Sequence, residues 1–139
     1  MMRPCIPALA LLMAACAAPP SQPPSLYERI GGEAVVHRVV EEVIDRSAAD
    51  PRTARSFKDV KIARVKEKLR EQICEISGGG CTYTGDPMRE VHKGLHNTDA
   101  EFASMVQFTR EALAHAGVGE REKNELLRLL APMKKDIVP

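Results

Sequence analysis

Residues 33–48 read EAVVHRVVEEVIDRSA, and this stretch decides the fold class. Its apolar residues recur at intervals of one, three and four: Val35, Val36, Val39, Val40, Val43 and Ile44. This spacing puts them on one stripe of an α-helix, whereas a half-buried strand would alternate apolar and polar residues. The stretch therefore predicts an amphipathic helix that buries its valine stripe.

The pattern continues in the next segment, residues 60–76. Its apolar face holds Ile62, Val65, Leu69, Ile73 and Ile76, with Lys and Arg on the opposite face. Asp59 is the expected N-cap of this helix, and Gly78 is the expected stop. A second long amphipathic helix is therefore predicted.

Two further helices are predicted towards the C-terminus. Residues 99–116 follow Thr98 and contain Glu101, which is the spacing of a capping box, and they end at Gly117. Residues 120–136 are predicted to form a helix that buries Leu126, Leu127, Leu129, Leu130 and Met133. Pro132 should bend this last helix or end its regular hydrogen bonding.

A short helix is predicted to begin at a second capping box, Ser25 to Glu28, and to stop at Gly31 and Gly32. No segment shows the alternation of a strand. The sequence therefore predicts an all-α domain over residues 26–139.

The first 25 residues have a different character. A basic start at Arg3 precedes an apolar run at residues 6–13, which is too short to span a bilayer. The segment LMAAC, ending at Cys16, resembles a bacterial lipobox, in which cleavage precedes an acylated cysteine. We expect a lipoprotein signal at residues 1–15, then a lipidated Cys16 and a proline-rich tether at residues 16–25.

This interpretation predicts an exported bacterial lipoprotein on the periplasmic face of a membrane. A plain secretory signal or a mistranslated start remains an alternative. Without Arg3 the chain has 19 basic and 19 acidic residues, so its charge gives no reason to expect binding to nucleic acid.

Cys74 and Cys81 lie seven residues apart across the loop SGGG. In an oxidising compartment a structural disulfide is the favoured interpretation. A metal site would need more clustered Cys and His, and a redox site would need a close CxxC.

Residues 78–97 form an irregular stretch with five glycines, Pro87, Tyr83, Met88 and His92. A loop this long in a small domain is functional or disordered, so it is where a site is expected.

Four motifs together resemble one known family. They are LYERIGG at residues 26–32, the Gly79-Gly80 pair, YTGDPMREVH at residues 83–92 and LAPM at residues 130–133. In this order the chain is similar to the truncated haemoglobins of group I over essentially residues 26–138. The resemblance implies a truncated globin, a two-over-two helical sandwich enclosing haem b.

The resemblance also implies site residues. His92 would be the proximal ligand of the haem iron, although a lone histidine in this sequence would otherwise be read as a surface residue. Phe57 would pack flat on the haem, and it is equally an ordinary core aromatic. Tyr83 and Met88 would lie near the haem edge, and Lys68 near a propionate.

The chain departs from the family on the distal side. Group I members commonly hold oxygen with polar residues at positions that fall here on Ile44, Val65 and Leu69, all of them apolar. A hydrogen-bond donor there contributes about 1.5–3 kcal/mol, or about 10- to 100-fold in ligand retention. Its loss favours rapid oxygen escape and relatively improves binding of CO and NO.

The expected function is therefore reversible binding of a diatomic gas (O2, NO or CO) at haem iron in an apolar distal pocket. One alternative is a six-coordinate haem protein, with Lys68 as the sixth ligand, for electron transfer or haem protection. Another is a haem-free envelope lipoprotein that acts as an interaction module. A third possibility is an enzyme such as an NO dioxygenase, which would need an electron donor that the sequence does not identify.

Overall fold

The computed structural model describes residues 22–139, and within that range every regular element is a helix. The elements are α1 (Leu26–Arg29), α2 (Gly32–Ala49), η1 (Ala54–Phe57), α3 (Ile62–Ile76), α4 (Met88–Val91), α5 (Asp99–His115), α6 (Glu120–Leu130), η2 (Ala131–Met133) and α7 (Lys134–Ile137). The prediction of an all-α domain is confirmed. None of these helices has the length and apolar character needed to cross a bilayer.

The predictions for the signal segment, for Cys16 and for most of the tether fall on residues 1–21, which lie outside the described residues.

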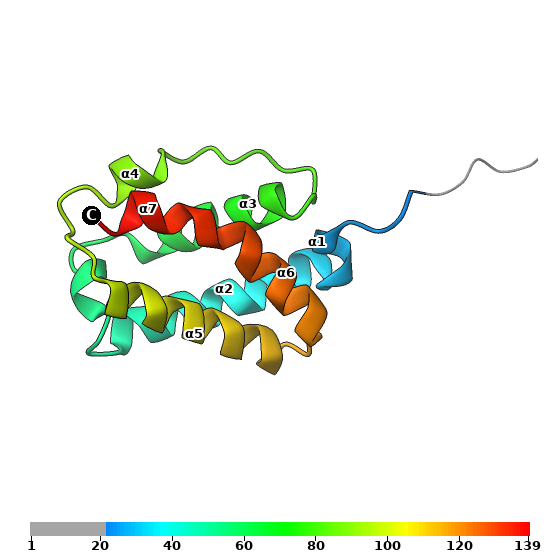
Figure 1. Ribbon diagram of the computed structural model, residues 1–139, viewed down its shortest axis with the longest axis horizontal. Helices are drawn as coiled ribbons and strands as arrows, with labels where there is room; N and C mark the ends of the chain where they lie inside the picture. The colour runs from blue at the N-terminus through cyan, green and yellow to red at the C-terminus, as the bar shows by residue number, and fades with distance from the viewer. Residues whose placement is uncertain (1–21) are drawn as a thin grey trace, which may run out of the picture.

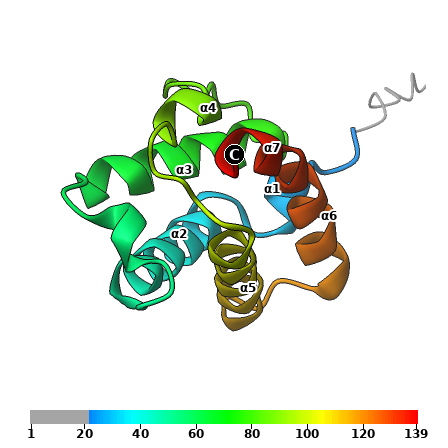
Figure 2. The same ribbon diagram turned by 60° about the vertical axis from the view of Figure 1, so that its left-hand side comes forward.

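The long helices form two packed pairs. Helix α2 lies against α3, and α5 lies against α6, while α2 also crosses α5 and joins the two pairs (Figures 1 and 2). The predicted two-over-two arrangement is confirmed. The short helix α4 follows the long connection from α3 and contacts α7 at the C-terminus (Figure 1).

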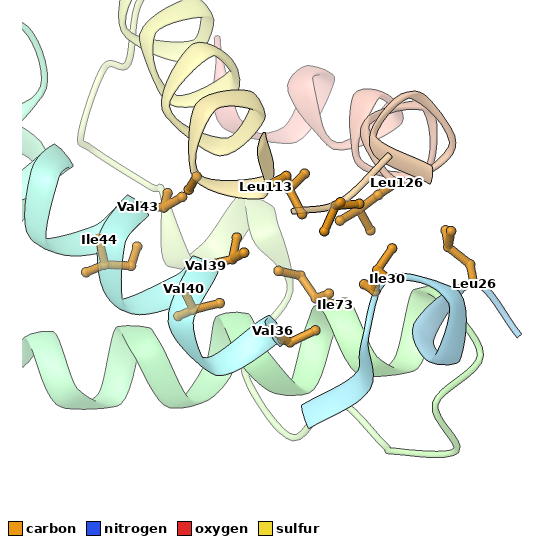
Figure 3. Close-up of a cluster of buried hydrophobic side chains, with 12 residues drawn as sticks. Leu26, Ile30, Val36, Val39, Val40, Val43, Ile44, Ile73, Leu113 and Leu126 are labelled. Atoms are coloured by element: carbon orange, nitrogen blue, oxygen red, sulfur yellow. The ribbon is translucent and has the colours of Figure 1, made fainter. Parts of the chain in front are cut away.

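The valine stripe of α2 forms the centre of the core (Figure 3). Val40 is fully buried, and so is Leu126 of α6. Ile73 of α3 and Leu113 of α5 are part of the same cluster. Burial of such side chains contributes about 1.5–3 kcal/mol each, so packing of α2 against α3 and α5 is a main source of stability.

Both predicted capping boxes are present. The Ser25 hydroxyl accepts from the Glu28 amide, and the Thr98 hydroxyl accepts from the Glu101 amide. Helix α3 differs from the prediction, because it begins at Ile62 with Lys61 as its N-cap. Asp59 has φ 59°, a left-handed conformation, whereas an N-cap residue needs extended backbone. The prediction that Asp59 caps this helix is wrong.

The last predicted helix is divided. Helix α6 ends at Leu130, and η2, which contains Pro132, separates it from α7. Proline has no amide hydrogen to donate, so the break was expected there. Leu129 is 41% exposed, because Leu126, Leu127 and Leu130 share the inward face and Leu129 falls at its margin. Its predicted burial is wrong.

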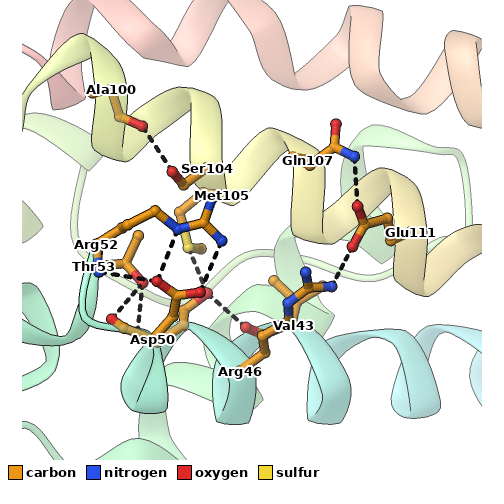
Figure 4. A network of polar contacts seen from close by, with 11 residues as sticks. Val43, Arg46, Asp50, Arg52, Thr53, Ala100, Ser104, Met105, Gln107 and Glu111 are labelled. Atoms are coloured by element: carbon orange, nitrogen blue, oxygen red, sulfur yellow. Dashed lines mark hydrogen bonds and ion pairs between the residues drawn. The ribbon is translucent and has the colours of Figure 1, made fainter.

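Polar contacts fix the turn after α2 against α5 (Figure 4). The Arg46 guanidinium lies 4.2 Å from the centre of the Phe108 ring and pairs with Glu111. The buried hydroxyl of Thr53 donates to the Ser47 carbonyl at 2.7 Å. This turn leads directly into η1, which carries Phe57, so these contacts set where Phe57 lies.

Candidate functional site

A cavity of about 620 Å³ lies between the two helix pairs and α4. Most of its wall is apolar, and it receives side chains from α2, η1, α3, α4, α5 and the C-terminal helices. It brings together every residue that the sequence placed around the site: Ile44, Phe57, Val65, Lys68, Leu69, Tyr83, Met88 and His92. Its volume falls in the range typical of ligand sites, about 300–1,000 Å³.

His92 stands at the C-terminal end of α4 and is half-buried. Its Nδ1 lies 2.8 Å from the carbonyl oxygen of Met88. A carbonyl can only accept, so Nδ1 carries a proton, and in the neutral imidazole Nε2 is then the nitrogen whose lone pair can bind a metal. Among the histidines, which all lie in the described range, His92 alone lines the cavity.

The segment after His92 is held by η1. The Arg55 guanidinium donates to the carbonyls of Leu95 at 2.7 Å and His96 at 2.9 Å. It also pairs with Glu101, which caps the start of α5. These contacts fix the path of the chain from the short helix α4 into α5.

The hydrogen bond from Arg55 lowers the pKa of the Glu101 carboxyl to about 2. Ser56 adds a hydrogen bond of 2.8 Å to the Asn97 amide oxygen. The turn at residues 95–97 is therefore bound to η1 through charged and neutral groups together.

The opposite wall is apolar. Ile44 is 2% exposed on α2, and Val65 and Leu69 stand one turn apart on α3. Phe57 of η1 and Met88 of α4 also face the cavity. Ile44, Val65 and Leu69 can offer packing to a ligand but no hydrogen bond.

The ammonium of Lys68 already has hydrogen-bond partners within the protein. Its ammonium lies 2.8 Å from the Glu71 carboxylate and 2.7 Å from the Thr84 hydroxyl. The hydrogen bond to Glu71 raises the pKa of Lys68 and, reciprocally, lowers the pKa of Glu71 to about 2. An amine that ligates iron must be deprotonated, so these contacts weigh against Lys68 as a sixth ligand.

The connection from α3 to α4 runs along α3. Cys74 and Cys81 form a disulfide with their Cα atoms 5.6 Å apart. The Tyr83 amide then donates to Glu75 at 3.0 Å, and the Tyr83 hydroxyl donates to the Asp86 carbonyl at 2.8 Å. These contacts place the Tyr83 ring at the cavity wall, where burial raises the pKa of its hydroxyl.

The sequence analysis did not identify several residues that line the cavity. Lys61, the N-cap of α3, and Arg64, in its first turn, line the cavity and make no ion pair within residues 22–139. Gln72 lines it while only 8% exposed. Gln72 could have been found from the sequence, because it is a polar residue beside Ile73 on the apolar face of α3. Asn97 also lines the cavity, but it lies in a loop where no periodic pattern identifies it.

Comparisons with known proteins agree with this geometry. The model of the bacterial-like globin family matches residues 25–138. The group 1 truncated haemoglobin of Mycolicibacterium paratuberculosis is 34% identical over 117 residues, covering 84% of this chain and 86% of that protein. A group 1 truncated haemoglobin from a Nostoc species is 30% identical, covering 82% of this chain and 97% of that protein.

Solved structures show the same fold. The truncated haemoglobin of Tetrahymena pyriformis in its Fe(III) form superposes with a TM-score of 0.79 at 24% identity, over 83% of this chain and 98% of that one. The 2/2 haemoglobin of a Synechococcus species, solved with covalently attached haem, gives a TM-score of 0.76 at 25% identity, over 83% and 98%. The chain therefore belongs to the bacterial-like globin family, among the group 1 truncated haemoglobins.

Proposed function

We propose that this protein binds haem b in the cavity through Nε2 of His92 and reversibly binds a diatomic gas, O2, NO or CO. The observation that carries the proposal is the hydrogen bond of 2.8 Å between His92 Nδ1 and the Met88 carbonyl, beside a largely apolar cavity. It leaves a neutral ring nitrogen available, which is the donor that haem iron takes from a globin.

Haem iron supplies reversible coordination of the gas. The residues of this chain supply orientation and a water-poor surrounding. Phe57, Tyr83 and Met88 line the cavity and would pack against a flat macrocycle. The hydrogen bond to Met88 fixes the ring of His92, so the imidazole does not have to reorganise when it binds a metal.

Lys61 and Arg64 would neutralise the two carboxylates of haem. Both line the cavity at the start of α3, where Lys61 is the N-cap and Arg64 lies in the first turn, and both lack an ion-pair partner within residues 22–139. The sequence had favoured Lys68 for this role, but its ammonium already pairs with Glu67 and Glu71. We therefore propose Arg64 and Lys61 as the principal cations for haem.

The apolar residues at positions 44, 65 and 69 shape the choice of gas. They provide no donor for a polarised ligand such as O2, while they exclude water from the cavity. These three positions therefore favour rapid release of O2 and relatively better retention of CO and NO. This favours a gas carrier or scavenger over a high-affinity oxygen store.

The test is a reduced-plus-CO difference spectrum of the wild type beside His92→Ala. The wild type should give a strong Soret band after haem addition, and His92→Ala should lose its stable haem. His37→Ala is the matched control, because His37 is exposed on α2 and does not line the cavity. A wild type without a Soret band would instead favour the haem-free interaction lipoprotein.

We also propose that the chain is exported and anchored on the periplasmic face of a membrane by a lipid on Cys16. The support is the LMAAC segment followed by an uncharged, proline-rich stretch. Expression of the full chain in a bacterium with mass analysis of the mature N-terminus tests this. An acylated Cys16 in the membrane fraction, lost in Cys16→Ser, is expected; a soluble product cleaved at another bond would contradict it.

A further inference from the structure

Gln72 is the polar residue that interrupts the apolar face of α3 inside the cavity. It is 8% exposed and lines the cavity together with Leu69. Neither the amide oxygen nor the amide nitrogen forms a hydrogen bond with any residue in the described part of the chain. The described residues contain no fully buried side-chain nitrogen or oxygen that lacks a partner, so the amide atoms of Gln72 keep some accessible surface. Because Gln72 lines the cavity, a ligand held there can supply the hydrogen bonds that the protein does not.

The other small polar side chains of the wall are used differently. Thr53 donates to the Ser47 carbonyl at 2.7 Å, and Thr109 donates to the Met105 carbonyl at 2.8 Å. Ser56 donates to the Asn97 amide oxygen. These hydroxyls serve the protein's own backbone and turns, whereas both ends of the Gln72 amide are available to a ligand.

The helical register places Gln72 on the face of α3 that lines the cavity. Val65, Leu69 and Gln72 stand at positions i, i+4 and i+7 of α3, which share one helical face. Val65 and Leu69 occupy the positions at which the resemblance led us to expect polar residues. Gln72 follows Leu69 by about 4.5 Å along the helix axis.

We propose that Gln72 donates a hydrogen bond from its amide nitrogen to the gas ligand and so sets the balance between O2 and CO. The inference rests on the proposed function, because it needs a gas held in this cavity. It refines that function, since Gln72 would supply a donor on the helical face that carries Val65 and Leu69, one turn beyond the positions at which the resemblance implies polar residues.

The test compares wild type, Gln72→Met and Gln72→Glu, with Gln107→Met as the matched control. Methionine keeps the length of the side chain and removes the amide, and glutamate keeps its shape while replacing the NH2 donor with an acceptor. Gln107 is exposed on α5 and donates to Glu111, away from the cavity.

Three measurements are informative. We expect O2 to dissociate about 10- to 100-fold faster in both Gln72 variants, as expected for one lost hydrogen bond to a polarised ligand, with Gln107→Met unchanged. The C–O stretching frequency of the CO form should rise in Gln72→Met, because a donor near the CO oxygen lowers it. The haem-free chain should melt at a higher temperature in Gln72→Met, because an unpartnered amide leaves the wall.

Unchanged O2 release and C–O frequency in Gln72 variants that bind haem would overturn the inference, as water would then be the partner of the amide. A lower melting temperature of haem-free Gln72→Met would also overturn it, because the amide would then have a protein partner. Loss of the Soret band in the wild type itself would instead mark failure of the proposed function.

Discussion

The two walls of the cavity are built by different physical means. The wall that carries His92 consists of a single helical turn, α4, and an irregular segment held by Arg55, Glu101 and Asn97. The facing wall consists of the long helices α2 and α3, whose residues Ile44, Val65 and Leu69 pack without polar contacts.

The contrast has a structural cause. A helix of four residues has few internal hydrogen bonds and little buried surface, so α4 depends on contacts from outside itself for its position. Helix α3 holds its residues by its own length and by packing against α2. His92, the proposed iron ligand, therefore lies on a segment positioned by charges and hydrogen bonds, whereas the facing surface of Ile44, Val65 and Leu69 is positioned by hydrophobic packing.

The largest effect is expected when a hydrogen-bond donor is introduced at Leu69, in the apolar wall that faces His92. Leu69→Gln should slow O2 release by about 10- to 100-fold, because a hydrogen bond to a polarised ligand contributes about 1.5–3 kcal/mol. Stopped-flow displacement of O2 by CO measures it. Leu69→Met is the control for side-chain shape, and an O2 release rate in Leu69→Gln equal to that of Leu69→Met would refute the claim that this wall faces the gas.

The second test loosens the connection between the walls. Cys81→Ser removes the disulfide that ties the segment before α4 to the end of α3. Closing a loop this short stabilises a fold by about 2–3 kcal/mol, so urea unfolding should show a loss of that size. Reductant should destabilise the wild type and leave Cys81→Ser unaffected; equal sensitivity of the two proteins would show that the bond does not contribute.

The third test uses low pH to break the ion pair between Arg55 and Glu101, which lies beside the segment after His92. The Glu101 pKa of about 2 lies below the ordinary value of about 4.3, so its ion pair with Arg55 stabilises the fold fully above about pH 4.3. That contribution is lost as the pH falls towards 2.

The haem-free wild type should therefore lose stability more steeply over this range than haem-free Glu101→Gln, as measured by urea midpoints at each pH. Other depressed carboxyls, such as Asp50 and Glu71, are common to both proteins and do not affect the difference. Parallel pH profiles would mean that the Arg55–Glu101 pair does not hold the segment after His92.

The smallest expected effect concerns Lys68. Because its ammonium is bound by Glu71 and Thr84, Lys68→Ala should leave the ferric optical spectrum unchanged at neutral pH. A six-coordinate low-spin spectrum in the wild type that disappears in Lys68→Ala would show that the lysine leaves these partners and binds iron.

Much of this fold could be predicted from the amino-acid sequence. The valine stripe, the two capping boxes and the break at Pro132 depend on residues within one or two turns of each other, and local interactions of this kind leave a periodic or positional signature. His92 was identified only through the family resemblance, because a single histidine has no pattern of its own.

Tertiary structure decided the rest. Arg55 donates to the Leu95 carbonyl 40 residues away, and no local pattern in the sequence predicts such a contact. The Lys68 ammonium donates to the Thr84 hydroxyl 16 residues away, because the segment that carries Thr84 folds back along α3. The type and order of the helices follow from local physics, whereas the partner of each polar side chain depends on which distant segments the packed core brings together.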